Sequence, residues 1–317
     1  MKRRQFLWNT GAGSAALLGM TKLAHAENVA AEPAIPFPIV DTHVHFWDTE
    51  RLDYPWLKNS ALLNRPYLLK DYDEAIGPVT VGKIVFVEAA CAAVHAMDEV
   101  DWVTSLAKED SRISGIVANV PLEQGETVLP KLKLLAKNPL VKGVRRFFVT
   151  EKDVPHGLLP ALVEGVKSLE QVGFHFELGL QRGQIPVAVE LVRQCPNIKF
   201  MLNHIGVPDI KNNVLDPWRQ EIRTLAEYPN VFCKMSGAAT VADHDSWTAE
   251  DLKPALDHVI ECFGFQRTVF GSDWPVMLLA TPYQRWVKTV AAAVKGCSET
   301  ELRQLFYNTA VAFYGLD

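Results

Sequence analysis

Short hydrophobic runs recur along the chain, and most of them are rich in Val, Ile and Phe. Such runs are typical of parallel β-strands that are covered on both faces, because neither face of the strand then has to be polar. Eight runs fit this description, namely Ile39–His45, Lys83–Glu88, Ile113–Val120, Val141–Val149, Phe174–Leu180, Ile198–His204, Val231–Ser236 and Thr268–Ser272.

The stretches between these runs have the spacing of amphipathic helices. Leu162, Val166 and Leu169 lie at i, i+4 and i+7, which places three apolar side chains on one helical face. The segment Ser298–Glu301 fits a capping box, in which a serine and a glutamate satisfy the free N–H groups that open a helix. Strands and helices therefore alternate along the chain.

This alternation predicts an α/β fold, a single-domain (β/α)8 TIM barrel over residues 37–317. The alternative is an open doubly wound sheet, but the first strand is not followed by the Gly-rich loop with which such sheets bind dinucleotides. The long segment 46–72 contains several aromatic residues, and we expect it to form an ordered insertion over the mouth of the barrel.

The N-terminal segment predicts export rather than a part of the fold. Lys2–Leu7 carries a twin-arginine motif, and a mildly apolar stretch follows as far as Met20. The segment Ala24–Ala26 offers a small-x-small cleavage site. We expect a signal peptide over residues 1–26 and a Pro/Ala-rich lead-in over 27–36. The bacterial twin-arginine export machinery would then be a partner, and the chain would be carried to the periplasm. After cleavage of the signal peptide, no stable membrane insertion would remain. An uncleaved membrane anchor is the alternative.

Composition narrows the classes of partner. The formal net charge is -5 and there is no long basic run, so a nucleic acid is not an expected partner. The five cysteines form no C-x-x-C pair and their number is odd, which favours buried free thiols over disulfides.

Polar side chains gather where the predicted strands end. His43 and His45 alternate along the first strand, so their imidazoles point to one face and can hold one metal ion together. In a TIM barrel, the carboxyl ends of the strands form the active site. The other strand-end candidates are Glu88, Arg145 and Arg146, Glu177 or Gln181, His204, Lys234 and Ser236, and Asp273.

Six segments carry a family resemblance, in family order and spread over residues 38–317. They are Asp41–Asp48, Tyr54–Leu57, Gly143–Arg145, Asn203–Pro208, Lys234–Gly237 and Phe270–Pro275. With these segments the chain resembles the amidohydrolase-related hydrolases of the TIM-barrel class. Within that class it is similar to the branch of lactonases that act on sugar-acid, pyrone or muconate lactones.

The resemblance implies one divalent metal ion, with zinc as the expected species. His43, His45 and Asp273 would be its ligands, and His204 or Glu88 would complete the shell. Neutral imidazoles and a carboxylate suit Zn²⁺ and leave one position open for water. A metal-free mechanism that uses the same histidines and the aspartate is the alternative, since some relatives in this branch work without metal.

The resemblance also implies catalytic and substrate-binding roles. Asp273 would take the proton from the attacking water, with His204 as the second catalytic residue. Arg145 would hold a substrate carboxylate or hydroxyl through its planar guanidinium, and Lys234 would be a second anion contact. Trp47 either lines the substrate pocket or packs beneath it.

Two departures from the wider family argue against a two-metal site. The fifth strand ends without a histidine and offers only Glu177 and Gln181. The fourth strand has no lysine at its end, because Lys142 lies near its start. One metal ion is therefore expected at most.

The expected function is hydrolysis of a small lactone, from a sugar acid or from the breakdown of an aromatic compound. Metal-dependent decarboxylation of a small carboxylic acid is a second hypothesis. A non-catalytic periplasmic binding protein is a third, although no catalytic group is missing from the sequence. The sequence leaves open which lactone is used and whether the chain forms a homo-oligomer.

Overall fold

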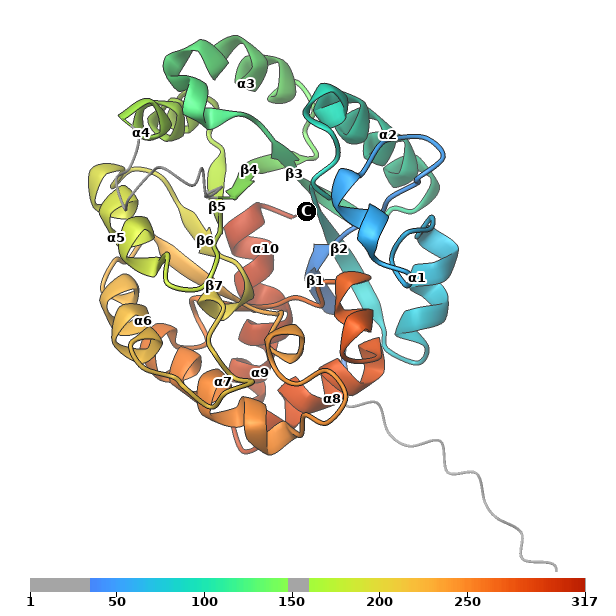
Figure 1. The fold of residues 1–317 in the computed structure, drawn as a ribbon, viewed down its shortest axis with the longest axis vertical. Helices are drawn as coiled ribbons and strands as arrows, with labels where there is room; N and C mark the ends of the chain where they lie inside the picture. Colours follow the sequence, from blue (N-terminus) through green and yellow to red (C-terminus); the bar gives the residue numbers. More distant parts are fainter. Residues whose placement is uncertain (1–34, 148–159, 317) are drawn as a thin grey trace, which may run out of the picture. The chain divides into compact units, whose positions relative to one another are not determined.

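The computed structural model describes residues 35–147 and 160–316, and there the chain forms a ring of eight parallel strands (Figure 1). Each strand pairs with the next along the sequence, in the order β1 to β8. The strands are β1 (Ile39–Val44), β2 (Val81–Val87), β3 (Ile113–Asn119), β4 (Val141–Phe147), β5 (His175–Gly179), β6 (Phe200–Leu202), β7 (Val231–Met235) and β8 (Thr268–Phe270).

The ring confirms the predicted barrel, and all eight predicted strands are present. The largest difference is in β6, which is shorter than the predicted apolar run at both ends, and β8 also ends early, because His204 and Ser272 already belong to the turns that follow these strands. The last two positions of the predicted fourth strand, residues 148 and 149, lie outside the described residues.

Helices surround the ring, as Figure 1 shows. The predicted capping box at Ser298 is confirmed, because its hydroxyl accepts the N–H of Glu301 and opens α9. The helices are α1 (Leu69–Ile76), α2 (Ala96–Glu109), α3 (Leu129–Leu135), α4 (Pro160–Lys167), α5 (Ile185–Gln194), α6 (Trp218–Ala226), α7 (Ala249–Phe263), α8 (Tyr283–Ala293), α9 (Glu299–Arg303) and α10 (Thr309–Tyr314).

A small second core fills the inside of the barrel, separate from the large core between strands and helices. Apolar side chains of five strands meet the C-terminal helix α10, which is seen through the middle of the ring in Figure 1. The helix therefore carries side chains into the barrel interior. The buried members of this inner core are Val40, Val85, Val87, Val117, Met201, Val269, Ala310, Phe313, Tyr314 and Leu316.

Strands β1 and β8 close the ring through a few individual hydrogen bonds. The N–H of Asp273 donates to the carbonyl of His43, and the N–H of His45 donates to the carbonyl of Trp274, each at 2.8 Å. These bonds lie at the carboxyl ends of the two strands. The closure of the barrel therefore fixes the positions of three of the predicted site residues.

A buried carboxylate strengthens this closure. Asp41 accepts the N–H of Ser272 at 2.8 Å and the N–H of His43 at 3.2 Å. Its second oxygen accepts the hydroxyls of Tyr72 and Tyr283, each at 3.0 Å. Burial raises the pKa of the Asp41 carboxyl, and the hydrogen bonds oppose that effect. Asp41 thus ties the end of β1 to the loop that follows β8.

The periplasmic location stays a prediction. The predicted signal peptide and the lead-in up to residue 34 lie outside the described residues. Within the described part of the chain, no helix is both long and apolar enough to cross a membrane. All five cysteines lie in that part, and each is a free thiol.

Candidate active site

Three histidines converge on one carboxylate at the carboxyl ends of the strands. The Oδ1 atom of Asp273 lies 3.3 Å from Nε2 of His45, 3.5 Å from Nε2 of His43 and 3.9 Å from Nε2 of His204. His43 is fully buried, while the side chain of His204 is 18% exposed. We call these four residues the mouth group. Its open side is the side of His204.

The backbone at the mouth group is held in an uncommon conformation. Both His204 and Asp273 have left-handed backbone, with φ of 51° and 66°, and Ile205 and Val207 share it. For residues other than glycine this conformation costs about 1–3 kcal/mol, and such strain gathers at functional sites. The turns after β6 and β8 therefore use strained backbone to aim His204 and Asp273 at each other.

Neighbouring groups orient two of the imidazole rings. Nδ1 of His45 lies 2.7 Å from the carbonyl of Val87, and Nδ1 of His204 lies 3.0 Å from Oγ of Ser236. Contacts of this kind fix the ring and leave Nε2 facing the site. Gly237 makes room for His204, because a Cβ at this left-handed position would lie 2.7 Å from the histidine.

Burial sets the protonation of the mouth group. Burial and the cations Lys234 and Arg145 hold the pKa of His43 well below its ordinary value. Burial also lowers the pKa of His204 to about 4, although Asp273 opposes the change. Burial alone would raise the pKa of Asp273, but the nearby histidines outweigh it and the pKa is lowered. At neutral pH His43 and His204 are therefore neutral imidazoles beside the ionised carboxylate of Asp273.

This donor set fits a divalent metal ion. One ligand atom each from His43, His204 and Asp273 can be chosen so that all three lie within 4.8 Å of one another. Two neutral imidazoles and a carboxylate are the ligands that Zn²⁺ takes in hydrolytic sites. The structure thus brings four of the five predicted ligands together, since His45 contacts the same carboxylate, and Glu88 is the exception.

Glu88 forms a buried ion pair with Arg145. Its Oε1 accepts Nε of Arg145 at 2.6 Å, and Arg145 also donates to the backbone carbonyl of Glu88. Burial alone would raise the pKa of Glu88, but Arg145 outweighs it and the pKa is lowered. Nη1 of Arg145 lies 3.3 Å from Nε2 of His43, so Glu88 fixes the guanidinium of Arg145 at the edge of the mouth group. Arg146 pairs instead with Glu123.

Lys234 lies deeper in the barrel than its predicted role as a substrate contact requires. Its side chain is fully buried, with Nζ at 2.6 and 2.8 Å from the two carboxylate oxygens of Glu177. Glu177 also accepts from Asn203 at 2.9 Å and from the hydroxyl of Tyr314 at 2.8 Å. We call these four residues the inner group. Nζ of Lys234 lies 3.4 Å from Nδ1 of His43, which links the two groups.

Electrostatics keep the inner group charged. Burial lowers the pKa of Lys234 to about 8 against the opposing effect of Glu177. Burial would raise the pKa of Glu177, but Lys234 outweighs it and the pKa falls well below its ordinary value. From the sequence, Glu177 was predicted only as one of the polar residues at the end of the fifth strand. A lysine inside an apolar strand should have indicated a buried counter-charge, because an unpaired buried charge is very costly.

Trp47 packs among aromatic side chains next to the site. Its side chain is fully buried, and its Nε1 donates to the carbonyl of Arg65 at 2.8 Å. Its ring lies 5.4 Å from that of Tyr67 and 6.4 Å from that of His45, measured between centroids. Of the two alternatives for Trp47, the geometry favours packing. Trp56, which is 39% exposed, lies over it within the predicted insertion.

A family profile, a related sequence and a solved structure all assign this chain to the same family and the same fold. The sequence profile of the amidohydrolase family matches residues 40–316. An L-fucono-1,5-lactonase of Burkholderia multivorans is 30% identical over 289 residues, which are 87% of this chain and 96% of that protein. An amidohydrolase crystal structure from the same species, with bound zinc, has a TM-score of 0.79 at 27% identity over 89% of this chain and 100% of that one.

A decarboxylase shares the architecture at a greater distance. The 5-carboxyvanillate decarboxylase of Sphingomonas paucimobilis has a TM-score of 0.62 at 13% identity, over 88% of this chain and 99% of that chain. An identity this low shows a common fold alone.

Proposed function

The chain belongs to the amidohydrolase family, and from that premise we propose that it hydrolyses a small lactone of a sugar acid. The observation that carries the proposal is the convergence of three imidazole Nε2 atoms on the ionised carboxylate of Asp273 at the barrel mouth. The similarity to an L-fucono-1,5-lactonase supports a sugar-acid lactone over an aromatic breakdown product.

The reaction begins with water and uses Asp273 as the general base. The water oxygen attacks the lactone carbonyl carbon while the carboxylate of Asp273 takes a water proton. The carbonyl oxygen becomes a tetrahedral oxyanion. When this intermediate collapses, the bond between the carbonyl carbon and the ring oxygen breaks. The proton on Asp273 passes to the ring oxygen, and the product is an open-chain hydroxy acid.

The remaining residues of the site stabilise the oxyanion and orient the attacking water. Arg145, fixed by Glu88, provides a positive charge 3.3 Å from His43 that favours the developing oxyanion. His204 lies on the solvent side of the site, where its neutral Nε2 can orient the water. A divalent ion held by His43, His204 and Asp273 would supply carbonyl polarisation and a lowered pKa for bound water.

A panel of sugar-acid lactones tests the proposal, with acid release followed by a pH indicator. The purified protein is assayed as isolated, after chelation, and after zinc is added back. We expect one or more lactones to open with release of one proton per product. Release of CO₂ from a carboxylic acid without lactone opening would instead support decarboxylation. Turnover that persists after chelation, with no metal found by elemental analysis, would select the metal-free route.

We also propose that the chain is exported to the periplasm by the twin-arginine route. The support is the Lys2–Leu7 motif and the cleavage site at Ala24–Ala26. Cell fractionation of a bacterial host tests this, with a variant that carries Arg3→Lys and Arg4→Lys together. The shortened protein should appear in the periplasm only with the native pair. Equal amounts from both versions would contradict the proposal.

A further inference from the structure

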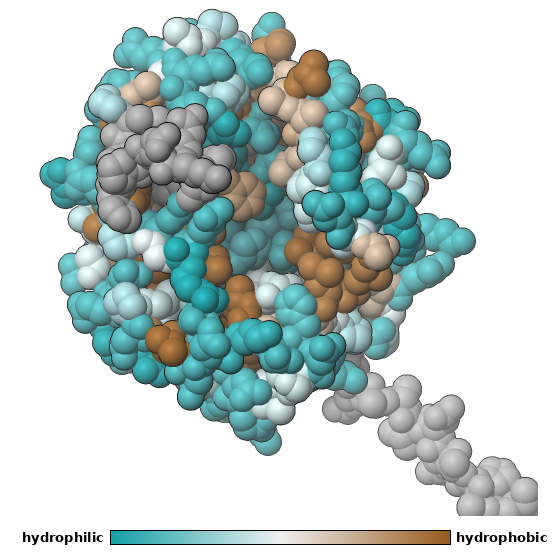
Figure 2. All heavy atoms as spheres, viewed as in Figure 1, coloured by the Kyte–Doolittle hydropathy of each residue, from teal (hydrophilic) through white to brown (hydrophobic). Residues whose placement is uncertain are grey.

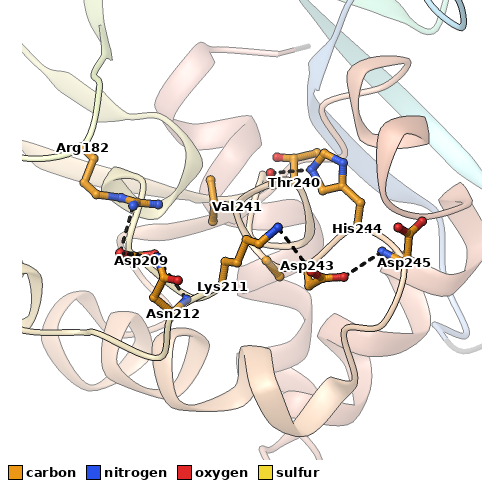
Figure 3. A pocket seen from close by; sticks show the side chains of 10 residues that line it. Arg182, Asp209, Lys211, Asn212, Thr240, Val241, Asp243, His244 and Asp245 are labelled. Carbon is orange, nitrogen blue, oxygen red and sulfur yellow. Dashed lines mark hydrogen bonds and ion pairs between the residues drawn. The ribbon is translucent and has the colours of Figure 1, made fainter.

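A polar cavity of about 430 Å³ lies between the loops that follow β5, β6 and β7. Figure 3 shows Arg182 on one side of it, His244 and Asp245 on the other, and Lys211 between them. The volume falls within the range of about 300–1,000 Å³ that is typical of small-molecule sites. Sites for apolar ligands are lined mainly by hydrophobic side chains, whereas this cavity is lined mainly by charged and polar ones.

Two ion pairs join the three loops around the cavity. Nη1 of Arg182 lies 3.0 Å from Oδ2 of Asp209, which connects the β5 loop to the β6 loop. Nζ of Lys211 lies 3.3 Å from Oδ2 of Asp243, which connects the β6 loop to the β7 loop. The N–H of Lys211 also donates to the carbonyl of Val241. The walls are therefore held together by specific contacts.

The same loops carry the mouth group and its support. The β6 loop carries His204 near its start and reaches the cavity at Asp209. In the β7 loop, the hydroxyl of the cavity-lining Thr240 donates to the carbonyl of Gly237, and Gly237 packs against the side chain of His204. One glycine therefore separates a wall of the cavity from the most exposed residue of the mouth group. Figure 2 shows that this face is hollowed and mostly hydrophilic.

The charges around the cavity indicate the class of ligand. The two cations Arg182 and Lys211 face three carboxylates, and each cation is already paired with an aspartate. The cavity therefore disfavours an anionic group. Hydroxyls both donate and accept hydrogen bonds, so a polyol can bond to the carboxylates and to the cations without breaking the ion pairs. A neutral, hydroxylated ring meets these requirements.

We propose that this cavity is a subsite for a neutral sugar unit attached to the lactone that the mouth group opens. The inference rests on the proposed function, because the unit is defined by its link to the lactone. The preferred substrate class then becomes the lactone of an oligosaccharide acid, with the lactone ring at the mouth group and the next sugar between the β6 and β7 loops.

Matched substrates test the inference on the full mature chain. The best monosaccharide lactone of the panel is compared with derivatives that carry one hexosyl unit on a ring or side-chain hydroxyl. We expect at least one derivative to show a tenfold or greater rise in kcat/KM, mainly through a lower KM, because the added sugar binds in both the ground state and the transition state.

Substitutions of cavity residues test whether the higher kcat/KM for the glycosylated lactone comes from this cavity. Lys211→Ala and Asp243→Ala should each remove most of the advantage of the glycosylated lactone and leave kcat/KM for the monosaccharide lactone unchanged. The matched control is Lys253→Ala, which removes an exposed pair with Asp257 at 2.7 Å on α7 and should change neither substrate.

The possible outcomes separate this inference from the proposed function. If no lactone is opened at all, the proposed function fails and the inference fails with it. If monosaccharide lactones are opened but every glycosylated form is equal or worse, only the inference is overturned. Equal loss for both substrates in the Lys211→Ala and Asp243→Ala variants would also overturn it, because that result describes loop support rather than recognition.

Discussion

The mouth group and the inner group are neighbours in the barrel, joined by the 3.4 Å approach of Lys234 Nζ to His43 Nδ1, yet their carboxylates have different surroundings. Asp273 faces three imidazoles and lies beside the partly exposed His204, so it can reach water and accept a proton. Glu177 is fully buried and is saturated by Lys234, Asn203 and Tyr314. We therefore propose that similar residues at strand ends serve chemistry in the mouth group and structural support in the inner group. Access to solvent and remaining bonding capacity make the difference.

Removal of the carboxylate of Asp273 should have the largest effect on activity. Asp273→Asn keeps the shape of the side chain but cannot take a proton from water, so we expect kcat/KM to fall roughly 10²- to 10⁴-fold. The melting temperature should change little, because the backbone bond from the Asp273 N–H to His43 remains. Steady-state kinetics and thermal unfolding measure both quantities. Retention of a tenth of wild-type activity would show that another group is the base.

Removal of the cation of the inner group should mainly reduce stability. Lys234→Met leaves the carboxylate of Glu177 buried without its ion-pair partner, which typically costs about 3–5 kcal/mol of unfolding free energy. The double variant Lys234→Met/Glu177→Leu removes both charges and should recover most of the loss. Urea unfolding of Lys234→Met, Glu177→Leu and the double variant measures this. A Lys234→Met protein within about 1 kcal/mol of wild type would show that the pair is not a structural unit.

The sequence predicted the barrel well because strand and helix periodicities are local signals. Each apolar run needs only its own residues to indicate a strand, and all eight strands were found. His43, His204 and Asp273 could be named because they follow directly after or within such runs. The strand ends of a TIM barrel share one face, so naming the ends was enough to assemble the mouth group.

The sequence could not give the depth of each side chain or its partner across the barrel. Spacing shows which way Lys234 and Glu88 point, but their partners Glu177 and Arg145 come from other strands. Tyr314 belongs to the last helix, and its contact with Glu177 spans 137 positions in sequence. Such contacts depend on how the barrel closes around α10, which no local pattern encodes.

The pH dependence of the melting temperature should show how much the charged inner group stabilises the fold. The pKa of Glu177 is lowered in the folded protein from an ordinary value of 4.5, mainly by Lys234 against the effect of burial. The unfolded chain therefore binds the proton first as pH falls, and the stabilisation from Glu177, complete above pH 4.5, is lost below it. Melting temperatures at pH 7, 5, 4 and 3.5 should fall more steeply for wild type than for Glu177→Gln. Parallel curves would place the acid sensitivity elsewhere.

Removal of the Tyr314 hydroxyl should have the smallest effect on stability. It also gives the clearest test of whether the mouth group and the inner group have different roles. Tyr314→Phe removes one donor to Glu177, which keeps Lys234 and Asn203, so the expected loss is about 1 kcal/mol of unfolding free energy. Because Tyr314 contacts only the inner group among the site residues described here, kcat and KM should stay within about twofold of wild type at neutral pH. Tyr283→Phe, which removes one of the donors to Asp41, is a matched control of the same size. A large fall in kcat for Tyr314→Phe without loss of stability would mean that the inner group takes part in the chemistry, and the distinction between the two groups would fail.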